Sequence, residues 1–189
     1  MNRLPFAIAL VHRPVVDRRG DLVTTAVTNL DVHDIARTAR TYKVDRFYIV
    51  TPVQEQLTLV ERILDHWHQG HGAEYNPHRG EALGLVRVAA SLQDALADWG
   101  QEVGVEPLPV LTGAKARDGL SYGACRELLK TRHLMLVLGT GWGLAPSLFA
   151  NGWPVLESIR GSSDYNHLPV RAAAAIMLDR LLAAGAGEK

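Results

Sequence analysis

The sequence contains little that could crosslink the chain or anchor it in a membrane. Among its 189 residues Cys125 is the only cysteine, so no disulfide can form within the chain, as is typical of a reducing, cytoplasmic compartment. The apolar run Phe6–Val11 is far shorter than the roughly 20 residues that a transmembrane helix needs. We therefore expect a cytoplasmic protein without a membrane segment, in which Cys125 is a small buried residue.

The chain also has no net charge, because 20 Lys and Arg balance 20 Asp and Glu. This excludes a strongly basic coat for nucleic acid but leaves room for a local basic face. The first 46 residues contain eight basic and five acidic side chains, so any polyanion contact is expected there. With 47% hydrophobic and 21% charged residues, the composition is that of a globular protein, and the length favours one domain over residues 1–189.

Apolar runs alternate with amphipathic helical patterns along the whole chain. Strands are expected at 6–11, 45–51, 85–90, 107–111, 133–138 and 155–159, and helices from about 31, over 57–67, from 91, and over 124–129, 147–150 and 167–184. Asn29 or Asp31 is the expected cap of the first helix, and residues 12–30 and 69–82 are expected to be connections. The alternation predicts a three-layer α/β/α fold with a mainly parallel sheet, whose ligands bind beyond the carboxyl ends of the strands.

Three glycines stand at alternate positions after one expected strand: Gly139, Gly141 and Gly143. Glycine lets a backbone turn sharply and approach a ligand closely. A tight structural turn explains the same pattern, and so does a dinucleotide site. The spacing is G-x-G-x-G after a late strand, however, and differs from the G-x-G-x-x-G of dinucleotide-binding folds.

A second segment, Tyr165 to Ile176, places Asn166 and His167 before the small residues Ala172 to Ala175. Small residues let a helix pack close to another backbone, and free amides at a helix start can bind a ligand. Capping of a buried helix is the simpler interpretation of this segment taken alone.

Together the two segments resemble motifs of the SPOUT class of S-adenosylmethionine-dependent RNA methyltransferases, in particular a bacterial family of single-domain members. Residues 136–144 are similar to the second motif of that class, and 154–159 with 166–176 to the third. Asn29 and the run Arg37-Thr38-Ala39 are similar to the first motif. The resemblance covers residues 6–182.

The resemblance implies a C-terminal trefoil knot over about 107–183, S-adenosylmethionine as cofactor, an RNA substrate (tRNA or rRNA), and a homodimer formed through the knot region. No metal is required. The cofactor-binding residues that it implies are Leu111, Thr112, Gly113, Leu138, Gly139, Thr140, Gly141, Gly143, Ile159, Asn166, His167 and Leu168. The catalytic candidates are Arg37, Asp164, His167 and Arg160, and the RNA-binding candidates are Arg13, Arg18, Arg19 and Arg40.

Ribose-methylating members of the class usually carry a Glu where this chain has Gly141 or Trp142, so the methylated atom, a base nitrogen or a ribose 2′-oxygen, stays open. Two other functions also stay open: a nucleotide- or dinucleotide-binding α/β module without methyltransferase activity, and a knotted cofactor binder that does not act on RNA. The histidines at 66, 68, 71 and 78 lack the spacing of a metal site and are expected to be solvated.

Overall fold

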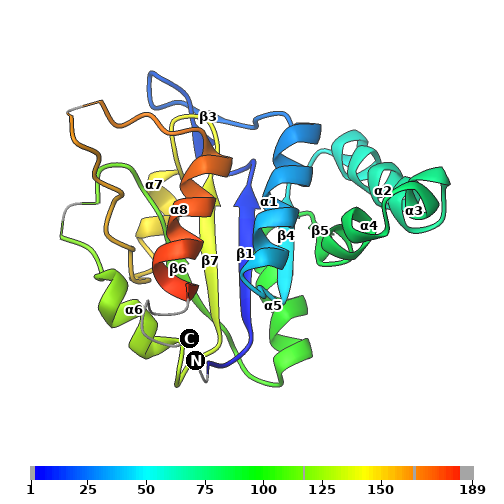
Figure 1. The fold of residues 1–189 in the computed structure, drawn as a ribbon. Helices are drawn as coiled ribbons and strands as arrows, with labels where there is room; N and C mark the ends of the chain where they lie inside the picture. The colour runs from blue at the N-terminus through cyan, green and yellow to red at the C-terminus, as the bar shows by residue number, and fades with distance from the viewer. Residues whose placement is uncertain (1–2, 117, 164, 184–189) are drawn as a thin grey trace.

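The computed structural model describes residues 3–116, 118–163 and 165–183, and its centre is a five-stranded sheet (Figure 1). The strand order is β5-β4-β1-β7-β6, and every neighbouring pair is parallel. The strands are β1 (Phe6–Val11), β4 (Arg46–Val50), β5 (Val86–Ala89), β6 (Leu108–Leu111) and β7 (Leu134–Gly139), and a separate hairpin pairs β2 (Val15–Val16) with β3 (Leu22–Val23). The parallel α/β prediction is confirmed.

Helices cover both faces of this sheet. They are α1 (Asn29–Thr41), α2 (Gln54–His68), α3 (His71–Tyr75), α4 (Pro77–Leu83), α5 (Leu92–Val103), α6 (Tyr122–Leu128), α7 (Pro146–Phe149) and α8 (Val170–Leu182). In β1, Phe6, Ile8 and Leu10 pack into one hydrophobic cluster with residues of α1, α6 and α8. The alternate residues of β1 pack into a second cluster with α5 and α7. A strand buried on both faces needs a continuous apolar run, which is what the sequence shows.

Two helix starts show how local sequence sets the element boundaries. Ser91 caps α5 as expected, since its side chain accepts a hydrogen bond from the amide of Asp94. The cap of α1 is Thr28, not Asn29 or Asp31: its hydroxyl accepts from the amide of Asp31 and donates to that residue's carboxylate at 2.6 Å. The reciprocal pair satisfies a backbone donor that would otherwise be free.

The expectation of a plain connection over 69–82 is wrong, because this segment forms α3 and α4. Asn76 caps α4 and Pro77 occupies its first turn, where the missing N–H of proline costs nothing. Gly72 and Gly80 bring both helices onto Trp67, since a Cβ at either position would stand 2.7–2.8 Å from Trp67 atoms. A helix of five to seven residues has too few turns to show a hydrophobic period, so the sequence pattern did not predict α3 or α4. Residues 12–30 likewise contain the β2–β3 hairpin.

The last expected strand, 155–159, is present as a short segment held on two sides. The amide of Leu156 donates to Leu111 O (2.8 Å), while the amide of Leu120 donates to Val155 O (2.7 Å). Both contacts are isolated parallel bridges. Residues 154–158 therefore lie between the end of β6 and residue 120.

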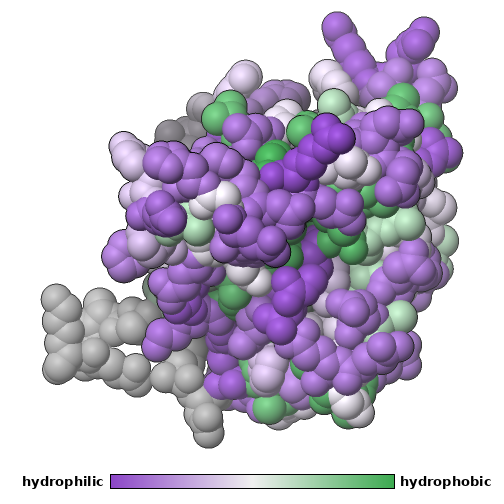
Figure 2. Space-filling view, turned by 90° about the vertical axis from the view of Figure 1, so that its right-hand side faces the viewer, coloured by the Kyte–Doolittle hydropathy of each residue, from purple (hydrophilic) through white to green (hydrophobic). Residues whose placement is uncertain are grey.

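The outer face of α2, α3 and α4 is largely hydrophilic (Figure 2). Over the described ranges, none of the helices has the length and apolarity needed to cross a lipid bilayer.

A buried polar group lies at the carboxyl end of β1. His12 is fully buried, and its Nδ1 lies 3.0 Å from Thr25 Oγ1, which in turn lies 2.5 Å from Thr140 Oγ1. No hydrogen-bond partner for His12 Nε2 is found among the described residues. Burial lowers the pKa of His12 from 6.5 to about 4, against a smaller opposing effect of Asp31.

We expect substitution of Gly119 to weaken the hydrogen bonds that hold residues 154–158 between Leu111 and Leu120. A Cβ at this position would overlap the carbonyl oxygen of Val155 and stand 2.9 Å from the amide nitrogen of Glu157. Gly119→Ala should lower the free energy of unfolding by about 1–3 kcal/mol, the usual cost of overpacking. Gly113→Ala is the matched control, because a Cβ there meets nothing within 4 Å. Equal denaturant midpoints for the two variants would contradict the expectation.

His12 should make stability depend on pH in a defined window. The unfolded chain takes up this proton near pH 6.5 and the folded chain only near pH 4. Stability from this group is therefore complete above pH 6.5 and declines as the pH falls to 4, by about 3 kcal/mol at most. Urea unfolding from pH 7.5 to 4 should show a shallower decline for His12→Asn. Parallel curves for the two proteins would refute the assignment.

Candidate cofactor and RNA site

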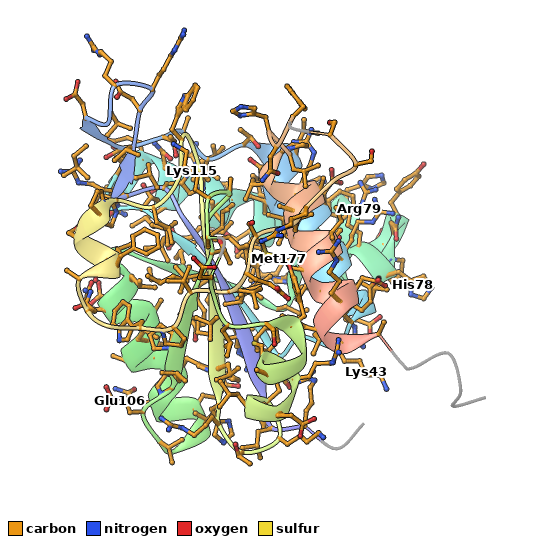
Figure 3. The ribbon with its side chains drawn as sticks, turned by 90° about the vertical axis from the view of Figure 1, so that its left-hand side faces the viewer. Lys43, His78, Arg79, Glu106, Lys115 and Met177 are labelled. Carbon is orange, nitrogen blue, oxygen red and sulfur yellow. The ribbon has the colours of Figure 1, made fainter. Side chains whose placement is uncertain are left out.

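Three loops meet at the carboxyl edge of the sheet. Residues 112–116 follow β6, 139–144 follow β7, and 159–168 follow the seated segment 154–158. The side chain of Asn166 donates to the carbonyl of Ala114 at 3.0 Å, which joins the third loop to the first. The ring of His167 meets Trp142 edge-on at 5.9 Å, which joins it to the second. In Figure 1 the arrow of β1 points to the upper end of the molecule. Figure 3 shows Lys115 of the first loop at this same upper end.

Packing within the protein explains two of the three alternating glycines. A Cβ at Gly139 would stand 2.7 Å from the amide nitrogen of Leu144, and one at Gly141 would stand 3.0 Å from Val16 O. Gly141 also has φ +60°. At Gly143, with φ +112°, a Cβ would meet nothing within 4 Å. Two of these glycines are thus required because the turn packs closely against itself and against β2. Only at Gly143 is there open space beside the backbone.

Two threonines fix the first two loops to the sheet. The hydroxyl and the amide of Thr112 both donate to Val137 O, at 2.9 and 3.1 Å. The hydroxyl of Thr140 donates to Val11 O at 3.0 Å. The apolar members of the predicted cofactor set, Leu111, Leu138 and Ile159, are buried beneath the loops. These strand ends give the loops a rigid base.

The third loop is more exposed than the sequence indicated. Helix α8 begins at Val170 after Pro169, so Asn166 and His167 precede it and do not form its first turn as expected. His167 and Leu168 are exposed, and the ring of His167 also lies 5.3 Å from that of Tyr165. The third loop therefore contributes exposed side chains and not helix-terminal amides.

Two further catalytic candidates belong to this loop. Arg160 is exposed directly after the buried Ile159. Asp164 lies outside the described residues.

The loop cluster fits an adenosine-containing cofactor. Each loop contains a glycine where a Cβ would meet nothing within 4 Å, namely Gly113, Gly143 and Gly161, so flat rings can approach the backbone there. The polar side chains Thr112, Thr140 and Asn166 are uncharged and already hydrogen-bonded within the protein, so neutral hydrogen bonds to a base and ribose would come from the loop backbone.

A pair of ion contacts connects this loop cluster to α1. Arg171, at the start of α8, places Nη1 3.3 Å from Asp31 Oδ1 and Nε 3.6 Å from Asp34 Oδ2. Sequence reasoning did not single out Arg171. A cation in the first turn of a helix opposes the helix dipole, and that unfavourable placement was the available signal that it has an acidic partner.

The catalytic candidate Arg37 lies on the other side of α1. Its side chain is exposed and lines a cavity of about 580 Å³ between α1, α2 and α4. Asn29, the other polar residue of the first motif, lines the same cavity. No described residue of the three loops lines this cavity, whereas Asp34, which contacts Arg171, does.

The four predicted RNA-binding arginines lie in two places. Arg13 donates to Thr24 Oγ1 at 3.2 Å, and Arg18 is exposed near the tip of the β2–β3 hairpin. Arg19, in the same hairpin, lies 3.5–3.6 Å from the carboxylates of Asp17 and Asp21. Arg40 forms an ion pair with Glu81 that ties α1 to α4. Arg19 and Arg40 are thus partly neutralised within the fold.

The remaining expectations concern Cys125 and the histidines. Cys125 is buried, and burial raises the pKa of its thiol to about 11, which confirms it as a packed core residue. In the part of the chain that the structure describes, no three His, Cys, Asp or Glu side chains are grouped as metal ligands would be. The histidines at 66, 68, 71 and 78 are all exposed, as expected, and His66 lines the same cavity as Arg37.

Comparison with known proteins identifies the family. A family model described as "SAM-dependent RNA methyltransferase" matches residues 5–183. A tRNA (guanine-N(1)-)-methyltransferase of Oleidesulfovibrio alaskensis is 40% identical over 174 residues, which are 92% of this chain and 41% of that protein. An uncharacterized protein of Aquifex aeolicus is 40% identical over 177 residues, which are 92% of this chain and 86% of its own length.

Among solved structures, the SpoU methyltransferase AviRb of Streptomyces viridochromogenes, in complex with the cofactor AdoMet, superposes with a TM-score of 0.55. The match covers 96% of this chain and 57% of AviRb at 14% identity, so it supports the fold alone. Nothing in these comparisons supports the dinucleotide-binding alternative. The chain belongs to the family of S-adenosylmethionine-dependent RNA methyltransferases and has the fold of its SPOUT class.

Proposed function

We propose that this chain methylates tRNA at an active site formed by the loops 112–116, 139–144 and 159–168 together with Arg37. The observation that carries the proposal is the convergence of the three loops, joined by the contacts of Asn166 and His167. A tRNA substrate is supported by the 40% identical relative named for tRNA, although this chain spans only 41% of that protein. Such a substrate places the reaction in the cytoplasm.

The finer topology is a trefoil knot. Segment 154–158 is hydrogen-bonded to Leu111 on one side and to Leu120 on the other, and the amide of Ser158 donates to Ala116 O at 2.9 Å. Pairing of one segment with both Leu111 and Leu120 supports a path in which the chain passes through its own earlier loop before it enters α8. Knots are rare, because threading a chain through its own loop is seldom part of folding. We propose the knot region at about 107–183, within a single domain over residues 1–189.

The chain's own residues divide the work of methyl transfer. S-Adenosylmethionine supplies the methyl group on its sulfonium. The residues at the cofactor loops bind it through backbone and uncharged groups: Leu111, Thr112, Gly113, Leu138, Gly139, Thr140, Gly141, Gly143, Ile159, Asn166, His167 and Leu168. His167 is our candidate for accepting the nucleophile's proton, because its exposed imidazole lies at the junction of the second and third loops.

Arg37 and Arg160 cannot serve as bases, because guanidinium stays protonated in proteins. Their role is to orient the RNA or to stabilise charge that develops on its nucleophile. Asp164 remains a second candidate base. Arg13, Arg18, Arg19 and Arg40 are proposed to contact RNA phosphates, which position the substrate without reading its sequence.

A homodimer through the knot region completes the proposal. Trp142, Tyr165 and Leu168 are exposed by 59%, 76% and 44% in the loops that meet at the site. The small side chains of Ala172, Ala173 and Ala175 on α8 are only partly buried. Exposed aromatic and apolar groups beside a face of small residues suit contact with a second copy, which would bring a partner's residues to the loops.

Cofactor titration is the first test of this function. Calorimetry should show micromolar binding of S-adenosylmethionine and no binding of NAD. Incubation with tRNA should then yield a methylated nucleoside after digestion, and its identity as N1-methylguanosine or a 2′-O-methyl nucleoside names the target atom. Binding of NAD in preference to S-adenosylmethionine, or methyl transfer to no RNA, would overturn the proposal.

Arg37 should contribute to the reaction and not to cofactor binding. Arg37→Gln should lower kcat by about 10²-fold or more, the usual effect of removing a group that stabilises the transition state. The Kd for S-adenosylmethionine should not change, because none of the loop residues that the structure describes lines the cavity in which Arg37 lies. The exposed Arg132, before β7, is the control position, and Arg132→Gln should retain full activity. Full activity of Arg37→Gln would remove Arg37 from the site.

A further inference from the structure

The cavity that Arg37 lines has more cationic side chains than the first motif accounts for. Arg62 of α2 and Arg79 of α4 line it as well. No carboxylate of the described chain forms an ion pair with any of these three guanidinium groups, whereas Arg3, Arg19, Arg40, Arg46 and Arg171 all have acidic partners. The one carboxylate in the wall, Asp34, lies 3.6 Å from Arg171. The cavity is therefore a concentration of uncompensated positive charge.

An aromatic side chain holds one of these arginines in place. Arg79 stacks over the ring of Trp67 at 4.9 Å from its centroid. His33 and His66 meet Trp67 edge-on at 5.6 and 5.2 Å. The pKa of His33 is lowered, first by burial and then by the positive charge of Arg79, so this side chain is neutral at pH 7 and offers both a donor and an acceptor. Trp67 thus preorganises Arg79, which reduces the entropy that this side chain loses when a ligand binds, whereas Arg37 and Arg62 are exposed.

Helices α3 and α4 lie in the connection from β4 to β5, where one helix would be enough to join the two parallel strands. The connection from β4 to β5 already contains α2, which contacts β5, and the two further short helices add Arg79 over Trp67. Tyr75, four residues before Arg79, is 79% exposed and stacks with His71 at 6.2 Å between centroids. Exposed aromatic rings and arginines on one element are a usual combination for binding single-stranded RNA. Figure 3 shows His78 and Arg79 projecting beyond α1 and α8.

We propose that the cavity between α1, α2 and α4 binds a backbone phosphate of the RNA substrate through Arg37, Arg62 and Arg79, with an unstacked neighbouring base contacting the aromatic groups of α3. A volume of about 580 Å³ lies within the roughly 300–1,000 Å³ of ligand sites and holds more than a phosphate. The inference rests on the proposed RNA methyltransferase function and adds a contact outside the three loops. It makes the insertion 71–83 a substrate-positioning element.

The test compares tRNA binding of the double variant Arg62→Gln/Arg79→Gln with that of the native protein over a range of salt concentrations. Loss of two phosphate contacts should reduce the slope of log affinity against log salt by about two. Affinity should fall on the order of tenfold for each arginine, as for loss of a charge-assisted hydrogen bond. Fluorescence anisotropy with labelled tRNA measures both. Arg132→Gln is the matched control and should bind as the native protein does.

Folding and the proposed function are monitored separately. Calorimetry with S-adenosylmethionine should give the same Kd for all variants. If the double variant unfolds, Arg62→Gln alone replaces it, because Arg62 is exposed and has no ion-pair partner in the described chain. Unchanged affinity and salt slope in variants that bind the cofactor would overturn the inference and leave the proposed function intact. Absence of tRNA binding by the native protein would overturn both. Loss of binding of a mononucleotide such as AMP, with tRNA affinity unchanged, would make the cavity a small-ligand site and also refute the inference.

Discussion

The seating of residues 154–158 between Leu111 and Leu120 is the constraint on which the functional part of the molecule depends. Without it, the loop 159–168 would have no fixed starting point and Asn166 could not reach the carbonyl of Ala114. The same segment places Glu157, whose carboxylate accepts a hydrogen bond from the amide of Tyr122 at the start of α6. One short stretch of backbone therefore holds a helix on one side and two loops on the other. It can do so because Gly119 has no side chain where the two backbones nearly touch.

The sheet supplies the rigid base for that arrangement. Both faces of β1 are buried, and its carboxyl end leads into a polar network of His12, Thr25 and Thr140 directly under the glycine-rich turn. The buried, neutral His12 lowers the stability of the protein at acid pH. At neutral pH it forms part of the hydrogen-bonded network beneath the turn. The turn itself is fixed by backbone bonds between Val16 and residues 142 and 143. The loops that are proposed to bind the cofactor are thus ordered by the fold before any ligand arrives, which lowers the entropic cost of binding.

Helix α1 divides the proposed active site into two parts. Its start is joined to α8 by Arg171, next to the third loop, whereas its outward face carries Arg37 into the basic cavity. This division suits a reaction between a small cofactor and a large polyanion. One side offers uncharged groups and open backbone, and the other offers guanidinium groups and aromatic rings. A dimer through the exposed aromatic residues of the loops would bring a second α1 and α8 near the same place.

The sequence by itself determined the class of fold, because continuous apolar runs and helical periods depend only on neighbours along the chain. It also located the glycine-rich turn and Asn166, since the motifs they belong to are local. It did not reveal α3 and α4, which are too short to show a period and are held by contact with Trp67. Nor could it bring Arg62 and Arg79 beside Arg37, or pair Arg171 with Asp31, 140 positions apart. Those contacts depend on how the helices pack on the sheet, and packing is decided by the whole tertiary structure because its partners are distant in sequence.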